Sequence, residues 1–343
     1  MLKVVYVLVS DLKDYFYEQM LISIASLRYR MDSVNIILLT EQVTGQLLKE
    51  KKAEVYSLVD RVVIHKVNGA FNMAEKSRIL KTKMRNSIEG DFLYIDCDTV
   101  VCENLEQITE LKCTGAVLDN HQLVNKEIYE FRPVVKRAEI MGYSCGYRDK
   151  HFNSGVMWCK DDPVTHQFFD LWNRLWLEGY KKGILYDQLS LNEANNRMGG
   201  RLQELNGEWN CQLRYGLPYL AEAKIIHYFA SNFSVNSERT FAYLLTDPVY
   251  LKAIRKERGI PDIVNKMIEK PRSAFHYAVI VDTGSLNYIL MNSNMGALLR
   301  FLYRKHKKIF IKTDRILEAI RKAAERCRNV HKEKKSRKAD QVD

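Results

Sequence analysis

The order of apolar and amphipathic segments is the feature that most limits what this chain can fold into. Over the first ninety residues three apolar runs alternate with three stretches of helical spacing: 3–9, 18–29, 35–40, 44–52, 61–67 and about 74–88. Short β-branched and aliphatic runs are typical of buried strands, and strands that are separated by helices form βαβ units. The sequence therefore predicts an α/β fold with a mostly parallel sheet flanked by helices.

A fourth apolar run, FLYIDCDTVV (92–101), contains two aspartates one residue apart. In a continuous strand the side chains of Asp96 and Asp98 lie on the same side, with Cys97 opposite. Two carboxylates side by side in a dry site repel each other, and a divalent cation relieves that repulsion. Their hard oxygen atoms favour Mg²⁺ or Mn²⁺. A solvated strand end, or capping of a following helix, is the alternative that D-x-D alone leaves open.

Two later segments place polar residues where a strand bends or a helix begins. HFNSGVMWCK (151–160) predicts a strand entered through a kink near Asn153. Glycine there allows close approach of a ligand, and the asparagine amide both donates and accepts hydrogen bonds, which suits sugar hydroxyls. A bulge that only bends the strand is the alternative. Asp187 and Gln188 open a short helix after a glycine turn, where simple capping is the alternative for Asp187.

A last short strand, KIIHY (224–228), ends on His227. Ligands of such sheets gather beyond the carboxyl ends of the strands, where Ser10, Asp11 and the aspartate pair are expected. An imidazole there could join two carboxylates as a third metal ligand, whereas a satisfied surface histidine is the alternative. No G-x-G-x-x-G follows the first strand and no P-loop occurs, so dinucleotide cofactors and P-loop ATP binding have no support.

Composition indicates a cytoplasmic protein. Apolar residues make up 46% of the chain, which is ample for a folded core. The seven cysteines are scattered and lack C-x-x-C spacing, a pattern that favours reduced thiols over structural zinc or disulfides. Charged residues from Asp11 onward interrupt the first apolar run too early for a signal peptide, and no later run approaches the length of a membrane span.

The positive charge is concentrated at the C-terminus. Residues 300–343 hold 16 lysines and arginines against 6 acidic residues, a net charge of +10 out of +11 for the whole chain. An apolar helical face is predicted within this tail, made of Ile316, Leu317, Ile320, Ala323, Ala324 and Cys327. Such a segment suits an anionic membrane surface, where each cation contributes about 1 kcal/mol. Nucleic-acid binding and a solvated helix packed on the body are the competing interpretations. Residues after His331 are expected to be disordered.

Taken in order, these motifs resemble the nucleotide-sugar glycosyltransferases of GT-A fold, a Rossmann-like architecture. The resemblance is strongest to glycosyltransferase family 8, the retaining group that includes glycogenin and bacterial lipopolysaccharide galactosyl- and glucosyltransferases. It runs from Val4 to about Tyr228. In the first half of the chain, residues 9–27 are similar to the family's opening strand and helix, 77–84 to its basic helix and 93–101 to its metal motif. In the second half, residues 152–157 are similar to its N-x-G strand, 186–192 to its D-Q helix and 225–228 to its terminal histidine.

The resemblance implies a role for each matching residue. Asp96, Asp98 and His227 would hold Mn²⁺ or Mg²⁺, which bridges the diphosphate of a UDP-sugar and stabilises the leaving UDP. The other implied contacts are with uridine (Asp11 and Tyr15), with the donor sugar or phosphates (Arg78 and Lys81) and with the sugar pocket (Asn153, Asp187 and Gln188). Transfer with retention follows either a front-face displacement or a double displacement, for which Asp187 or Gln188 is the only candidate near the anomeric carbon.

One departure from the family pattern concerns a phosphate-binding lysine. The family continues after its histidine with a glycine and then K-P-W, whereas this chain has HYFASNFSVNSERTF (227–241). Either Lys224, Arg239 or another cation substitutes, or the donor is bound differently.

The resemblance also implies a domain plan and a partner. We expect a catalytic domain at 1–236, followed by a helical extension at 237–299 and the basic tail at 300–343. Within the catalytic domain, residues 1 to about 120 are expected to bind the nucleotide, and residues from about 121 to 236 are expected to bind the acceptor and the sugar. The expected acceptor is a glycan or lipid-linked saccharide in cell-surface polysaccharide synthesis, such as lipopolysaccharide or capsule. The enzyme is then expected on the cytoplasmic face of the membrane.

Two other functions stay open at this point. IDCDTVV also fits the signature of haloacid dehalogenase-type phosphohydrolases, with Asp161 and Asp162 as a late acidic pair, although that signature normally ends the first strand of its domain. A non-catalytic basic-tailed binding protein with a structural D-x-D is the third reading, and it leaves Asn153, Asp187 and His227 without a purpose.

Overall fold

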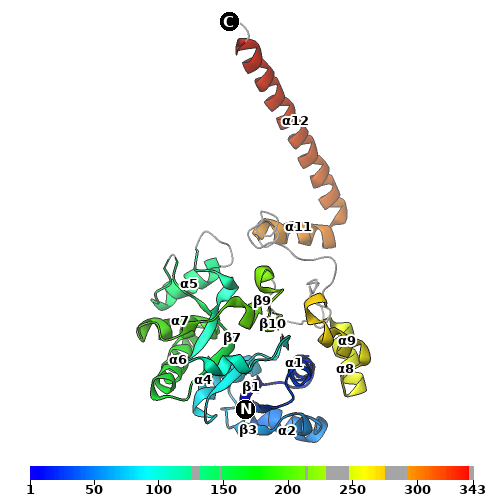
Figure 1. The fold of residues 1–343 in the computed structure, drawn as a ribbon. Helices are drawn as coiled ribbons and strands as arrows, with labels where there is room; N and C mark the ends of the chain where they lie inside the picture. Colours follow the sequence, from blue (N-terminus) through cyan, green and yellow to red (C-terminus); the bar gives the residue numbers. More distant parts are fainter. Residues whose placement is uncertain are drawn as a thin grey trace. The chain divides into compact units, whose positions relative to one another are not determined.

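The computed structural model describes residues 1–125, 131–146, 148–212, 215–228, 247–274, 290 and 293–339, with side chains as far as residue 323 (Figure 1). The chain divides into two compact units, Met1–Asp282 and Thr283–Asp343. Each unit is described by itself.

A seven-stranded sheet forms the centre of the first unit, in the order β3-β2-β1-β4-β7-β6-β8. Its strands are β1 (Leu2–Leu8), β2 (Val34–Glu41), β3 (Arg61–His65), β4 (Phe92–Ile95), β6 (Gly115–Leu118), β7 (Phe152–Cys159) and β8 (Gln203–Glu204). β3, β2, β1 and β4 are parallel, β7 is antiparallel to both β4 and β6, and β8 is parallel to β6. The predicted α/β fold with a mostly parallel sheet is confirmed.

Helices cover both faces of this sheet. Those of the first unit include α1 (Phe16–Arg30), α2 (Gln42–Lys51), α3 (Val55–Leu58), α4 (Met73–Lys83), α5 (Arg132–Met141), α6 (Pro163–Lys181), α7 (Asp187–Arg197), α8 (Pro248–Glu257) and α9 (Asp262–Glu269). Alternate residues of β1 enter two separate cores, with Val4 and Tyr6 packing with α1, α8 and α9, and Val5 and Val7 packing with α4 and α6. Burial on both faces explains why this strand is apolar throughout.

The run 92–101 is not the continuous strand that alternation predicts. β4 ends at Ile95, residues 96–98 form a turn, and β5 (Thr99–Val101) joins a second, three-stranded sheet with β9 (Cys211–Gln212) and β10 (Ile225–His227). β5 pairs antiparallel with β10, which places Thr99 opposite His227. The expectation that a single strand orients both aspartates is therefore wrong, because the chain changes sheets between them.

The second unit contains α11 (Asn294–Lys305) and α12 (Lys307–Ala339). Within it, Tyr303 and Phe310 meet edge to face with ring centroids 5.2 Å apart. The sequence indicates disorder after His331, whereas the backbone is helical as far as Ala339, through a run that contains neither glycine nor proline. In the described part of the chain, no helix combines the length and the hydropathy needed to cross a membrane.

Candidate active site

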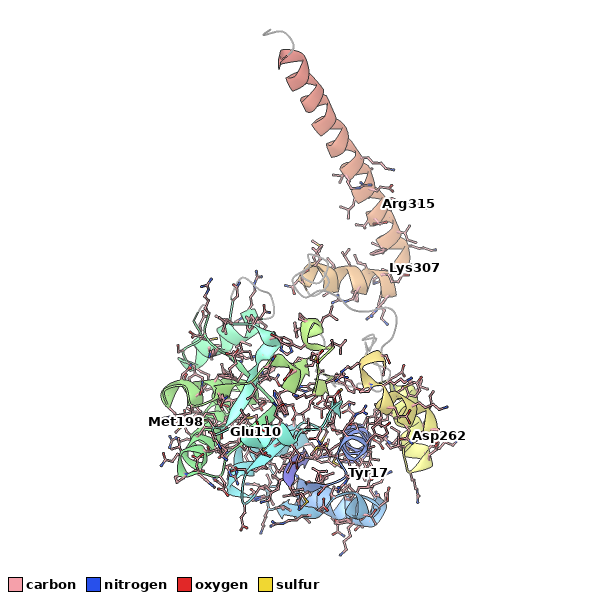
Figure 2. The ribbon with its side chains drawn as sticks, viewed as in Figure 1. Tyr17, Glu110, Met198, Asp262, Lys307 and Arg315 are labelled. Carbon is pink, nitrogen blue, oxygen red and sulfur yellow. The ribbon has the colours of Figure 1, made fainter. Side chains whose placement is uncertain are left out.

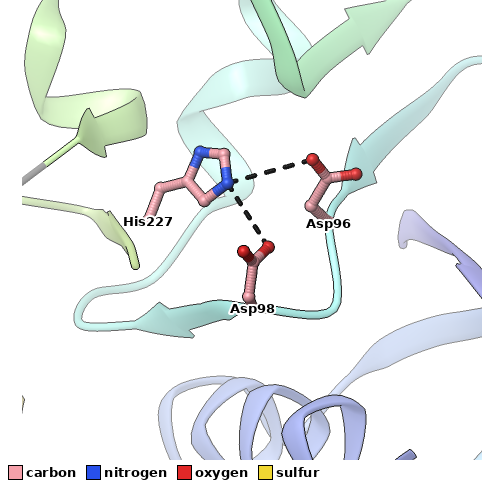
Figure 3. A group of neighbouring side chains, drawn as sticks. All are labelled: Asp96, Asp98 and His227. Carbon is pink, nitrogen blue, oxygen red and sulfur yellow. Dashed lines mark ion pairs between the residues drawn. The ribbon is translucent and has the colours of Figure 1, made fainter. Parts of the chain in front are cut away.

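Asp96, Asp98 and His227 meet at the junction of the two sheets (Figure 3). His227 Nε2 lies 3.3 Å from Asp98 Oδ1 and 3.9 Å from Asp96 Oδ2, and one ligand atom from each residue lies within 4.8 Å of the others. The sheet change makes this possible, since it turns Asp98 toward the strand that carries the histidine. Residues 131 positions apart in the sequence thus share one site.

Backbone hydrogen bonds hold the two aspartates in place. The amide of Asp96 donates to the Gly155 carbonyl at 2.7 Å, and the amide of Tyr228 donates to the Asp98 carbonyl at 2.9 Å. Thr99 Oγ1 closes the turn by donating to the Asp96 carbonyl at 2.8 Å. The carboxylates are therefore presented by a fixed turn rather than by a free loop.

This donor set fits a divalent cation. Ligand atoms bound about 2.1 Å from one ion at right angles are about 3 Å apart. The separations of 3.3 Å and 3.9 Å from His227 Nε2 need only small side-chain movements to reach that value. Two carboxylate oxygens and one imidazole nitrogen match the preferences of Mn²⁺ and, with waters and phosphate oxygens completing the shell, of Mg²⁺. An ion there would also offset the negative charge of Asp98 and the part of the charge of Asp96 that Lys81 leaves.

A chain of amides fixes which nitrogen of His227 faces this position. Asp119 is a carboxylate and accepts from Asn153 Nδ2 at 2.9 Å, so Asn153 Oδ1 must point toward Asn210, whose Nδ2 donates to it at 2.9 Å. Asn210 Oδ1 then accepts from His227 Nδ1 at 3.0 Å. Nδ1 therefore carries a proton, and Nε2, which faces the carboxylates, is the nitrogen that a metal ion can bind.

Removing the acceptor at Asn210 tests this orientation. We expect Asn210→Leu to weaken Mn²⁺ binding by about 10- to 100-fold, because the imidazole loses the hydrogen bond that fixes its tautomer and rotation. Isothermal titration with Mn²⁺ measures the effect. Asn195→Leu is the matched control, since it removes another buried amide, which accepts from the Leu202 amide away from the site. Equal Mn²⁺ affinities of the two variants would contradict the orienting role.

The pKa of His227 has a direct consequence for metal binding. Burial lowers this pKa, but the charges of Asp98 and Asp96 and the hydrogen bond to Asp98 outweigh burial and raise it above its ordinary value. A cation must displace the proton, so its affinity should fall as the pH falls through the raised pKa.

We therefore expect the apparent Kd for Mn²⁺ to increase by up to about tenfold for each pH unit below that pKa, beginning above the ordinary histidine value of about 6.5. Titration of the protein with Mn²⁺ between pH 8 and pH 6 tests the effect. An affinity that does not change over this interval would show that the imidazole is not a ligand.

Two basic side chains of α4, Lys81 and Arg78, lie next to Asp96 and Asp187. Lys81 Nζ from α4 lies 3.1 Å from Asp96 Oδ1 and 3.6 Å from Asp187 Oδ2, and Arg78 Nε lies 2.9 Å from Asp187 Oδ1. Ser154 Oγ also donates to Asp187 Oδ2 at 2.8 Å. Burial raises the pKa of Asp187, but Arg78, Lys81 and Ser154 more than offset it and lower that pKa below its usual range. The buried carboxylate is therefore ionised.

The remaining predicted residues are placed as follows. Asn153 is buried in the amide chain and Gln188 is half-buried at the first turn of α7. Asp11 accepts from the amide of Lys13 at 2.9 Å in the loop after β1. Tyr15 is buried in the same loop, with its ring under a guanidinium 4.5 Å from the centroid.

Lys224 is not placed to replace the missing lysine. It lies before β10, at the end opposite His227, with its ammonium 3.9 Å from Glu208. Arg239 lies outside the described residues.

Asp161 and Asp162 cannot serve a phosphohydrolase site at Asp96. β7 is antiparallel to β4, so Cys159 lies opposite Phe92 and the two aspartates follow at the sheet edge away from Asp96. Asp162 accepts from the amide of Thr165 and caps α6. The geometry therefore removes the acidic pair on which that alternative relied.

Asn210 and Asp119 are site residues that the sequence did not reveal. Each follows or precedes a short strand, and neither belongs to a recognisable pattern. The nearest signal in the sequence is the short apolar run GAVL (115–118), which favours a strand whose carboxyl end carries Asp119.

The fold is of GT-A type, and three side chains that could hold a cation lie beyond the carboxyl end of the central strand. Residues 90–232 match the family described as "Glycosyl transferase family 8". Over this segment the chain is similar to the glycosyltransferases of family 8.

Several solved structures are similar to this chain, and the likeness to the first of them supports the fold. Galactosyltransferase LgtC, in complex with donor and acceptor sugar analogues, is 15% identical with a TM-score of 0.50, over 77% of this chain and 99% of its own. Mouse xyloside xylosyltransferase 1 is 14% identical with a TM-score of 0.46, over 68% of this chain and 99% of its own. Glycosyltransferase GlyE of Streptococcus pneumoniae TIGR4 is 16% identical with a TM-score of 0.45, over 81% of this chain and 66% of its own. No curated protein matches the chain significantly by sequence.

Proposed function

We propose that this protein transfers a sugar from a UDP-sugar to a glycan or lipid-linked saccharide, with retention, in cell-surface polysaccharide synthesis, and that the reaction needs Mn²⁺ or Mg²⁺. The observation that carries the proposal is the convergence of Asp96, Asp98 and His227 within 4.8 Å. A cation at these residues would bind the donor diphosphate and stabilise the negative charge that develops on the leaving UDP.

The chain's own residues prepare the site for an anionic donor. Lys81 offsets part of the charge of Asp96 and is almost fully buried, so its ammonium is fixed rather than mobile. Arg78 is more exposed, with 39% of its side chain accessible, and it can turn toward a phosphate or a sugar while remaining near Asp187. Both cations lie close enough to the aspartates to contact the donor's phosphates.

The contacts of Asp187 favour a front-face displacement over a covalent intermediate. Oδ1 of Asp187 pairs with Arg78, and Oδ2 accepts a hydrogen bond from Ser154 with Lys81 close by. Neither oxygen is therefore free to attack the anomeric carbon. In this scheme Asp187 holds the two cations in position, Gln188 and Asn153 line the sugar pocket, and the acceptor hydroxyl enters on the side that UDP leaves. Asp11 and Tyr15 border the uridine.

The proposed catalytic activity can be tested with UDP-sugars and Mn²⁺. We would incubate the full chain with a panel of UDP-sugars, with Mn²⁺ or with EDTA, and measure UDP release. Release that needs the metal supports the transferase. Phosphate release from p-nitrophenyl phosphate without UDP release would instead support a phosphohydrolase, and salt-sensitive binding of duplex DNA or RNA with neither activity would support a binding protein.

We further propose that the second unit binds the cytoplasmic face of an anionic membrane, close to a lipid-linked acceptor. Exposed apolar side chains are interspersed with cations along α11 and α12: Met295, Leu298, Phe301, Tyr303, Ile309, Ile311, Ile316, Leu317 and Ile320. Lys308, Lys312 and Arg315 lie on the same face of α12 as Ile311 and Ile316. Ala324 and Cys327 of the predicted apolar face lie beyond the described side chains. An exposed apolar surface with a basic border suits the interface of an anionic bilayer.

Deleting residues 300–343 should abolish sedimentation with vesicles that contain phosphatidylglycerol, while UDP release continues at the wild-type rate. The deletion removes a net charge of +10 and most of the exposed apolar surface of α11 and α12. Vesicles of phosphatidylcholine alone provide the control, and they should bind neither form. Unchanged sedimentation of the shortened protein would reject the membrane role.

A further inference from the structure

Arg255 of α8 contacts the loop that follows β1 and the first turn of α1 through all three nitrogens of its guanidinium. Nε and one terminal nitrogen donate to the two carboxylate oxygens of Glu18, each at 2.8 Å. The terminal nitrogens also donate to the carbonyls of Lys13, at 3.4 Å, and Asp14. The guanidinium carbon lies 4.5 Å from the centre of the Tyr15 ring. Consecutive residues of the loop and the first turn of α1 are thus held by one side chain.

The loop has a conformation that needs such support. Leu12 has φ of 63°, a left-handed conformation that a leucine rarely adopts. Ser10 Oγ donates to Asp14 Oδ1 at 2.8 Å and accepts from the Leu12 amide at 2.9 Å, which folds the loop back on itself. The carbonyls of Lys13 and Asp14 face outward from this turn, toward Arg255.

The ion pair with Glu18 is fixed by burial. The Glu18 side chain is only 2% accessible, so its charge depends on Arg255 for neutralisation. α8 itself is anchored by Leu251 and Ile254, which are buried in the core shared with α1. The position of the guanidinium is therefore fixed by its ion pair with Glu18 and by the packing of α8 in the core.

The loop borders the proposed donor site. It begins at the carboxyl end of β1, which is the parallel neighbour of β4, and Cys97 between the metal-ligand aspartates donates from Sγ to the Val7 carbonyl at 3.4 Å. The family match ends at residue 232, whereas α8 begins at Pro248. A helix outside the matched segment thus contributes to the nucleotide side of the site.

We infer that Arg255 is a positioning residue for the donor: it holds the loop at residues 10–16 in the shape that receives the nucleoside of a nucleoside diphosphate sugar. The inference rests on the proposed function. It assigns the C-terminal extension a part in donor binding rather than in the transfer step. Loss of Arg255 should therefore affect donor affinity and leave turnover at saturating donor nearly unchanged.

The test uses two arginines of the same extension. Arg255→Lys keeps the charge but loses the bidentate ion pair with Glu18 and the stacking on the Tyr15 ring. Arg272→Lys is the matched control, because Arg272 is similarly exposed and also pairs with a glutamate, Glu103, and a carbonyl, that of Ala223, away from the loop. UDP affinity in the presence of Mn²⁺ is measured by calorimetry for the full chain and both variants.

We expect the Kd for UDP to increase about tenfold in Arg255→Lys and less than twofold in Arg272→Lys, with kcat for UDP release within about twofold of wild type. Hydrogen exchange at the amides of residues 12–16 should increase in the first variant alone. If Arg255→Lys does not fold, Glu18→Gln weakens the same contact and should increase the Kd about threefold.

Equal UDP affinities for wild type, Arg255→Lys and Arg272→Lys would overturn the inference while leaving the transferase intact. A fall in kcat with unchanged affinity would also overturn it. A wild-type protein that does not bind UDP with Mn²⁺ would overturn the proposed function, and the inference with it.

Discussion

Replacing Asp98 by asparagine should reduce metal-dependent UDP release by about 10³-fold or more, since the loss of one charged ligand costs several kcal/mol of transition-state stabilisation. Asp98 lies nearer to His227 Nε2 than Asp96 does, and its carboxylate is 13% accessible, so water compensates little for its loss. Steady-state kinetics with a saturating UDP-sugar and excess Mn²⁺ give the measurement.

Asp161→Asn provides the control for this variant. Asp161 is also an aspartate close to a histidine, with His166 Nε2 at 2.8 Å, but it lies at the opposite edge of the sheet. The transferase account predicts activity near that of wild type for Asp161→Asn. A comparable loss in both variants would argue against a metal site confined to residues 96, 98 and 227.

Replacing Gly155 by alanine should weaken Mn²⁺ binding, with an increase in Kd of about 100-fold or more. A Cβ at this position would lie 2.2 Å from His227 Cε1 and 2.8 Å from Asp96 Oδ2, both under the 3.0 Å at which a neighbour must move. The strand behind Gly155 is fixed by its pairing with β4, so the two ligand side chains must move. Calorimetry with Mn²⁺, and the thermal unfolding temperature with and without Mn²⁺, measure the loss.

Gly69→Ala is the control for the glycine prediction. No heavy atom lies within 4 Å of a Cβ built at Gly69, so this substitution should leave metal binding and activity unchanged. If Gly155→Ala bound Mn²⁺ as tightly as Gly69→Ala, the crowded arrangement of His227 and Asp96 would be incorrect.

Periodicity found the strands and helices because each face of the sheet is buried. The run at β1 is apolar throughout since its two sets of side chains enter two different cores. The same rule failed at 92–101, where every residue of β4 and β5 is buried, yet the chain changes sheets between them. An apolar run predicts that a segment is buried, but it does not predict which sheet the segment joins.

Some residues of the candidate site could be predicted from the sequence, and others could not. Asp96, Asp98, Asn153, Asp187 and His227 stood out because their residue types recur in one order, which a resemblance can detect. Asn210 matters because of a hydrogen bond to a ring nitrogen 17 residues away, and no spacing encodes such a bond. Glycine at 155 was expected to admit a ligand, but the structure shows that it makes room for the imidazole of His227.

The central claim is that one divalent cation is bound jointly by Asp96, Asp98 and His227. The most direct test is anomalous diffraction at the manganese edge from crystals grown with Mn²⁺ and UDP. The account predicts one manganese peak per chain in bonding contact with both carboxylates and with Nε2 of the imidazole, and with the diphosphate of UDP. UDP bound with no manganese at these three side chains, or manganese bound elsewhere, would contradict it.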